Sequence, residues 1–191
     1  MGNNIKMNCF FKYVTKVLEG IKWRKMTYEE RKQYNIILLR KRGIVIGENT
    51  DIIDTTFDTN FPFLITIGND CIITGATILC HDASHILFSN RVKIGKVTVG
   101  NRCFIGMGAI VLPGVRIGDD CVIGSNSTVT KSVADDSVMV GSPARFIGKT
   151  SIILHRLEAG VNCKFIEGVY GNFRTRDELY QLKEKAKKML D

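Results

Sequence analysis

The sequence lacks several features that would define other classes of protein. It has no cysteine pair at the C-x-x-C spacing of metal sites, no apolar run near the roughly 18 residues that a membrane span needs, and no low-complexity segment. No secretory signal precedes its six cysteines. We therefore expect reduced thiols and a cytoplasmic protein. Its 191 residues fit about one domain, and a hydrophobic content of 45% is ample for a core.

Positive charge is concentrated at one end of the chain. Residues 1–42 hold eleven Lys or Arg and three Glu, which accounts for the whole net charge of +8. Apolar residues of this segment step by three and four and predict one face of a helix: Met7, Phe10, Phe11, Val14, Val17, Leu18 and Ile21. Such a basic arm either lies on an anionic membrane surface, or packs on the remaining chain or another subunit with its basic face in water. The body beyond it is neutral, and we expect no nucleic-acid partner.

Two further helices are marked by capping boxes. Thr27 and Glu30 form the first box, and Gly43 is predicted to end that helix. The second box, at residues 175–178, opens a helix that closes the C-terminal extension, residues 149–191.

A repeat of six residues organises the middle of the chain. Aliphatic residues recur without a slip at Val99, Ile105, Val111, Ile117, Ile123 and Val129. Four places after each comes a smaller residue: Cys103, Ala109, Val115, Cys121, Ser127 and Val133. Gly follows the aliphatic residue at four of these positions. It suits tight corners, where a side chain would clash or where φ must be positive. A helix has a period of 3.6 and an isolated strand one of 2, so this period predicts a parallel β-helix.

The repeat is interrupted twice between residues 43 and 148, the predicted β-helix domain. It begins at Ile46 and Ile52, breaks over residues 57–64, resumes at Ile67, Ile73 and Leu79, and ends after Val129. The gaps of 21 residues from Ile46 to Ile67 and 20 from Leu79 to Val99 are not multiples of six. Each gap therefore predicts an excursion from the coils, and the second, near residues 81–96, is the better candidate for function because loops on rigid scaffolds often carry it. Cys71, Cys103 and Cys121 share one phase of the repeat and are expected to be small inward fillers.

The second excursion opens with Cys80-His81-Asp82-Ala83-Ser84-His85, which holds two of the three histidines of the chain. Imidazole titrates near neutral pH, so either histidine is a candidate general base, while a surface role without chemistry stays open. A Cys80–His81 nucleophile pair is not expected, because consecutive residues of an extended chain point to opposite sides.

Residues 44–148 resemble the hexapeptide-repeat acyltransferases, most of all the bacterial sugar, capsule and lipopolysaccharide O-acetyltransferases. The motifs that carry the resemblance are Ile-Gly-Asn-Asp-Cys-Ile-Ile (67–73), Leu-Cys-His-Asp-Ala-Ser (79–84), Val-Gly-Asn-Arg-Cys-Phe-Ile-Gly-Met-Gly-Ala-Ile-Val-Leu-Pro-Gly-Val (99–115), Ile-Gly-Ser-Asn-Ser-Thr-Val-Thr-Lys-Ser-Val (123–133) and Val-Gly-Ser-Pro-Ala-Arg (140–145). The resemblance implies an all-β, left-handed parallel β-helix, a homotrimer, acetyl-coenzyme A as cosubstrate and a sugar or glycan acceptor. It also implies direct attack of the acceptor hydroxyl on the thioester, assisted by a loop histidine, with no metal required.

The same resemblance assigns candidate site residues. His81 matches the catalytic histidine of similar enzymes, with Cys80 in place of a threonine, and His85 is the rival base. Asp82 orients an imidazole, binds the acceptor or caps the turn, and Asp58 matches an acidic position of the acceptor pocket. The positions that match coenzyme A contacts are Gly106, Met107, Gly108, Ala109 and Ser125, with Lys131 and Arg145 at the nucleotide phosphates. Turn geometry is the alternative reason for the small residues, and a solvated edge for the two cations.

Two other functions are compatible with the same fold. A non-catalytic assembly subunit would need neither a loop histidine nor a coenzyme groove. A γ-type carbonic anhydrase needs three zinc-binding histidines, but His155 lies beyond the predicted β-helix, far from His81 and His85. The sequence leaves the acceptor and the acyl group open.

Overall fold

The computed structural model describes residues 26–153 and 176–190. It divides the chain into two compact units, one with residues 35–165 and the other with the two chain ends, including helix α5 (Arg176–Leu190). The predicted helix of residues 7–21 and Thr175 of the second capping box lie outside the described residues. Within the described part, no helix combines the length and the apolar character that crossing a membrane requires.

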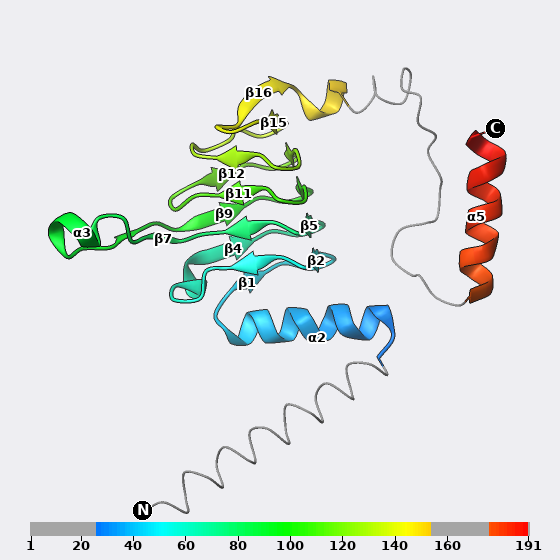
Figure 1. The fold of residues 1–191 in the computed structure, drawn as a ribbon, viewed down its shortest axis with the longest axis horizontal. Coiled ribbons are helices and arrows are strands. Elements are labelled where there is room, and N and C mark those ends of the chain that lie inside the picture. The colour runs from blue at the N-terminus through cyan, green and yellow to red at the C-terminus, as the bar shows by residue number, and fades with distance from the viewer. Residues whose placement is uncertain (1–25, 154–175, 191) are drawn as a thin grey trace, which may run out of the picture. The chain divides into compact units, whose positions relative to one another are not determined.

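The larger unit contains a stack of coils whose strands form three sheets (Figure 1). Sheet A consists of β1 (Val45–Ile46), β4 (Ile65–Ile67), β9 (Val97–Val99) and β12 (Arg116–Ile117). Sheet B consists of β2 (Asp51–Ile53), β5 (Ile72–Thr74), β10 (Phe104–Ile105), β13 (Val122–Ile123), β15 (Val138–Val140) and β16 (Arg145–Gly148). Sheet C consists of β3 (Thr56–Phe57), β6 (Thr77–Ile78), β11 (Ile110–Val111) and β14 (Thr128–Val129). All these pairings are parallel except that of β15 with β16, so the chain forms the predicted parallel β-helix.

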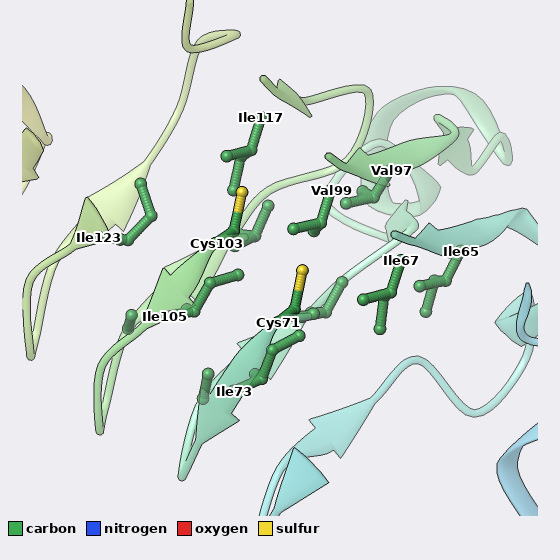
Figure 2. Packing of buried hydrophobic residues seen from close by; sticks show 14 of the residues in the cluster. Ile65, Ile67, Cys71, Ile73, Val97, Val99, Cys103, Ile105, Ile117 and Ile123 are labelled. Atoms are coloured by element: carbon green, nitrogen blue, oxygen red, sulfur yellow. The ribbon is translucent and has the colours of Figure 1, made fainter. Parts of the chain in front are cut away.

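The six-residue repeat places one inward aliphatic side chain on each sheet. Ile105 pairs with Ile73 and Ile123 in sheet B, and all three are completely buried. Figure 2 shows these side chains one above another in successive coils. Each buried aliphatic side chain of this kind contributes roughly 1.5–3 kcal/mol. The predicted ladder from Val99 to Val129 is confirmed, since each member is at most 3% exposed.

The predicted register is wrong at two places. Ile78, not Leu79, occupies the inward position of β6, where it pairs with Val111. The corner of residues 74–76 is one residue shorter than the corner of residues 106–109, so the spacing from Ile73 is five there. The ladder also continues past Val129, because Val133 bridges Ile117 and β15 extends sheet B.

Three of the small inward residues, all cysteines, fill one corner of the coils. Cys71, Cys103 and Cys121 are free thiols, at most 2% exposed, as predicted. Each thiol donates to a carbonyl oxygen of the next coil at 3.0–3.1 Å, as Cys103 does to Gly118. Figure 2 shows the Cys71 and Cys103 sulfurs beside the isoleucine ladder.

The repeat glycines are required by close approach, not by a positive φ. A Cβ on Gly100 would lie 2.6 Å from the Gly118 carbonyl oxygen and would also meet the Asp119 carboxylate. The positive φ values of these corners fall two residues later, at Arg102 (52°) and Asp120 (55°). Of the two reasons expected for these glycines, the clash is the one that the structure supports.

Helix α2 (Tyr28–Lys41) begins and ends as predicted. The Glu30 carboxylate accepts the Thr27 N–H at 2.7 Å, and the Thr27 hydroxyl accepts the Glu30 N–H at 3.3 Å. Gly43, at φ 94°, donates to the Arg40 carbonyl, and Ile44 donates to that of Leu39, which is a Schellman ending.

Both predicted excursions leave the coils between sheets C and A. The first contains the 3₁₀ helix η1 (Pro62–Leu64). Phe57, expected within this break, is instead a buried member of sheet C. The second is a hairpin of β7 (His81–Asp82) and β8 (Lys93–Ile94) with helix α3 (Ile86–Ser89) between them. It projects from the side of the coils (Figure 1).

Candidate active site

The two excursions meet at the carboxylate of Asp58. Asp58 follows strand β3, and its backbone N–H donates to the Ile78 carbonyl of the next coil. Because β3 lies beside β6, the residue after β3 is placed against the residues after β6. The start of each excursion therefore lies in one corner, which we call the C–A corner.

The Asp58 carboxylate is saturated with N–H donors. Its Oδ1 atom accepts the backbone N–H groups of Asn60 and Phe61, both at 2.9 Å. Its Oδ2 atom accepts the backbone N–H groups of Cys80 at 2.8 Å and His81 at 3.0 Å. The side chain has no exposed area, so the carboxylate faces these donors, and the expected acceptor contact of Asp58 stays a prediction.

The fifth donor to Asp58 is the ring of His81, whose Nδ1 atom lies 2.5 Å from Oδ2. Burial acts to raise the pKa of Asp58, but the N–H groups of Phe61, Cys80 and Asn60 and the His81 ring outweigh it and lower the pKa to about 2. The carboxylate is therefore ionised and can only accept hydrogen bonds, so Nδ1 carries the proton. In the tautomer that carries its proton on Nδ1, the Nε2 atom of His81 holds the free lone pair that a general base needs.

Aromatic side chains line the same place. The Phe61 ring lies 5.5 Å from the His81 ring, centroid to centroid, and 6.1 Å from that of Phe63 in an edge-on arrangement. Ile94 pairs with His81 across the hairpin and is 55% exposed. The His81 side chain is 24% exposed, which leaves part of the ring accessible beside these apolar groups.

Two other candidates in the hairpin have hydrogen-bond partners of their own. The Asp82 carboxylate accepts the Ser84 N–H at 2.9 Å, the turn-capping alternative among the three considered. His85 is exposed at the start of α3, where its backbone carbonyl accepts the N–H groups of Phe88 and Ser89.

Cys80 cannot act with His81 as a nucleophile pair. Its side chain is completely buried, and burial raises the pKa of the thiol to about 11. The thiol therefore stays protonated at neutral pH and points into the core.

The candidate coenzyme residues form a different corner, between sheets B and C. Residues 106–109 join β10 to β11, and Ser125 lies in the equivalent corner one coil later. Met107 is 65% exposed, and the Met107 carbonyl accepts the Asn126 N–H. A Cβ on Gly108, at φ 72°, would clash with the Asn126 side chain, so turn geometry alone already requires that glycine. Ala109 is buried, and Gly106 lies against Ser125.

The two candidate cations are separated. Lys131 is exposed at the C–A corner after β14, on the side of His81. Arg145 is exposed at the start of β16, after a turn that contains Gly141. The Gly141 N–H donates to the Ser127 hydroxyl of the B–C corner, and the Gly141 carbonyl accepts the N–H of Thr128 in β14. Residues 106–109 precede the strands of sheet C, whereas His81 follows them. Within one chain, His81 and residues 106–109 therefore lie at opposite ends of the strands of sheet C.

Sequence reasoning missed Arg42 and the two phenylalanines. The Arg42 guanidinium donates to the Asp58 carbonyl at 3.1 Å. No short motif connects these residues, although Phe61-Pro62-Phe63 begins three residues after Asp58, the acidic position that the resemblance had matched. His155 lies outside the described residues, and within the described ones no cluster of three acidic, His or Cys residues is placed to hold a metal.

Comparisons with known proteins agree with this architecture. The family model of bacterial transferase hexapeptides (six repeats) matches residues 96–131. Protein CapG of Staphylococcus aureus is 36% identical over 117 residues, which cover 57% of this chain and 67% of that protein. Galactoside O-acetyltransferase of Escherichia coli (strain K12) is 36% identical over 89 residues, which cover 44% of each chain. The chain spans about half the length of the first curated relatives that it matches.

A solved structure adds evidence on the fold. The polySia-specific acetyltransferase NeuO matches with a TM-score of 0.50 and 20% identity, covering 74% of this chain and 63% of that chain. At this identity the likeness concerns the fold alone. Together with the hexapeptide match, it confirms the expected left-handed parallel β-helix.

Proposed function

This chain belongs to the hexapeptide-repeat acyltransferase family, and from that premise we propose that it transfers an acetyl group from acetyl-coenzyme A to a hydroxyl of a sugar or glycan. The observation that carries the proposal is the pairing of His81 with Asp58. A partly exposed imidazole is held by a buried carboxylate, with its second nitrogen free for a substrate. A general base for a hydroxyl nucleophile needs this arrangement.

The reaction follows from that geometry in one addition and one elimination. His81 Nε2 takes the proton of the acceptor hydroxyl while the hydroxyl oxygen bonds to the thioester carbon. The C–S bond then breaks, the thiolate of coenzyme A leaves, and the imidazolium returns the proton to it. Asp58 stays ionised throughout, holds the Nδ1–H, and stabilises the imidazolium. The buried, protonated Cys80 is not needed, because no covalent enzyme intermediate forms.

We further propose that the coenzyme lies along the B–C corner, at residues 106–109 and Ser125, with Arg145 of the same subunit at its phosphates. Lys131, which lies on the side of His81, would reach the phosphates from the neighbouring subunit. This corner and His81 of the same chain lie at opposite ends of sheet C, which supports an active site built from two copies. A homotrimer supplies such an interface three times, with His81 from one subunit beside residues 106–109 of the next. A monomer mass in light scattering would count against this arrangement.

The test is thiol release from acetyl-coenzyme A across a panel of sugars and glycans. His81→Ala is expected to lower kcat by roughly 10²–10⁴-fold, the usual contribution of a general base, with unchanged coenzyme binding. His85→Ala is the matched control on the same hairpin and is expected to keep turnover. If only His85→Ala loses turnover, His85 is the base. If wild-type protein neither binds coenzyme A nor releases thiol with any acceptor, the assembly-subunit function replaces this one.

A further inference from the structure

A cation lies beside the proposed base although the mechanism does not use it. Arg42 follows helix α2, is exposed, and donates through Nη2 to the Asp58 backbone carbonyl at 3.1 Å. The side chain of the same Asp58 bonds His81, so one residue and two hydrogen bonds separate the guanidinium from the imidazole. Given bond lengths and hydrogen-bond distances, Nη2 and Nδ1 are at most roughly 12 Å apart. That span suits one sugar ring with its substituents.

Close packing fixes the backbone next to Arg42. Gly43, the next residue, lies so near the first excursion that a Cβ there would be 3.0 Å from the Phe63 Cβ and 3.4 Å from its Cα. The Schellman ending of α2 sets the direction of this contact. Figure 1 shows the end of α2 on the same side of the coils as the β7–β8 hairpin. Arg42, Phe63 and His81 therefore belong to one surface.

Phe61 and Phe63 give that surface an apolar part. Phe61 is partly buried against the core and contacts both the Phe63 and His81 rings. Phe63 is 61% exposed, an unfavourable placement for a phenyl ring unless something covers it. An exposed ring beside a base that takes a proton from a sugar hydroxyl can cover the C–H face of a pyranose.

The charges favour an anionic ligand. Asp58 is ionised and buried, and its carboxylate is fully used by N–H donors. The Arg42 guanidinium has five N–H donors, whereas its hydrogen bond to Asp58 uses one. The remaining exposed donors suit a carboxylate or a phosphate, which guanidinium groups bind in bidentate fashion.

We propose that Arg42, Phe61 and Phe63 form the acceptor subsite, and that this subsite selects a pyranose ring carrying an anionic group, either a carboxylate or a phosphate. The ring stacks on Phe63, the anion binds Arg42, and the hydroxyl to be acetylated faces His81 Nε2. This inference rests on the proposed transferase function, whose acceptor it specifies.

The experiment compares three acceptors that differ at one carbon: methyl glucuronide, methyl glucoside 6-phosphate and methyl glucoside. Binding is measured by saturation-transfer NMR and turnover by thiol release. Wild-type protein is expected to prefer the anionic sugars by about tenfold or more, as a charge-assisted hydrogen bond implies. Arg42→Gln is expected to remove that preference in both measurements. Lys41→Gln, which removes the neighbouring exposed charge, is the matched control and is expected to keep the preference.

The aromatic part has its own variant. Phe63→Ala is expected to weaken saturation transfer to all three sugars several-fold and to raise their KM, because the ring contact does not depend on charge. The anion that the subsite takes is identified by comparing glucuronide with the 6-phosphate, as the one of the two sugars that wild-type protein binds more strongly.

The outcomes separate the subsite from the transferase function. No preference for anionic sugars, or a preference that Lys41→Gln abolishes as fully as Arg42→Gln, overturns the subsite. If His81→Ala stops turnover while the anionic preference is missing, the transferase function stands and the subsite fails. If the Arg42-dependent binding is present but His81→Ala leaves turnover unchanged, the subsite stands and the proposed base fails.

Discussion

Asp58 Oδ2 lies 2.5 Å from His81 Nδ1, although 23 positions separate the two residues in the chain. The coil that connects them is 21 residues long, as the pairing of Phe57 with Ile78 shows. Each residue begins an excursion from the same corner, so stacking of coils brings them together. The carboxylate is thereby buried among the histidine ring and four backbone N–H groups.

Asp58→Asn is expected to lower kcat by roughly 10²-fold or more, because an amide cannot accept all five N–H groups and no longer holds the ring in one tautomer. The KM for acetyl-coenzyme A is expected to stay unchanged, since Asp58 acts through His81. Steady-state kinetics separates the two parameters. Asp82→Asn is the control, because that carboxylate caps its own turn. An equal loss of activity in both variants would count against the assignment.

The same carboxylate predicts a pH dependence of stability. Its pKa is lowered from 3.8 to about 2 in the folded protein, so the folded state favours the ionised form. The stabilisation is therefore complete above about pH 4 and is lost as the pH falls toward 2, with an expected size of about 2 kcal/mol. Urea unfolding between pH 5 and pH 2 measures it. The difference in unfolding free energy between wild type and Asp58→Asn is expected to shrink over this range, and a constant difference would contradict the prediction.

The register of β6 is tested by two neighbouring residues. Ile78→Ala is expected to lower the free energy of unfolding by about 2–5 kcal/mol, because the side chain is completely buried in the ladder. Leu79→Ala is expected to cost clearly less, since that side chain is only partly buried. Chemical denaturation followed by circular dichroism compares them. A larger loss of unfolding free energy in Leu79→Ala than in Ile78→Ala would indicate that Leu79 faces inward, as the strict six-residue repeat predicts.

Two corner glycines allow the cost of a steric clash to be compared with the cost of a positive φ. Gly100→Ala is expected to destabilise strongly, because its Cβ would be 2.6 Å from the Gly118 carbonyl oxygen. Gly114 has a φ of 85° and nothing within 4 Å of an added Cβ, so Gly114→Ala is expected to cost only about 1 kcal/mol of left-handed strain. Thermal unfolding of the two variants gives the comparison. Equal losses would show that close approach is not what requires Gly100.

The coils could be predicted from the sequence alone. A period of six, read along one stretch, assigned the inward residues from Val99 to Val129 and the buried phase of Cys71, Cys103 and Cys121, because each coil repeats the same local geometry. The ends of α2 were also readable, since Thr27, Glu30 and Gly43 act within a few residues. The interruptions of the period located both excursions for the same reason.

The contacts of the excursions, in contrast, form between distant segments and could not be predicted from local sequence. Whether Ile78 or Leu79 faces inward depends on a corner length that is set by stacking on the next coil, not by the local sequence. Asp58 accepts hydrogen bonds from Cys80 and His81, and its carbonyl accepts one from Arg42. All of these bonds join segments that are distant in the chain. A hydrogen bond of this kind leaves no periodic trace, because its partners meet only after the coils between them have stacked.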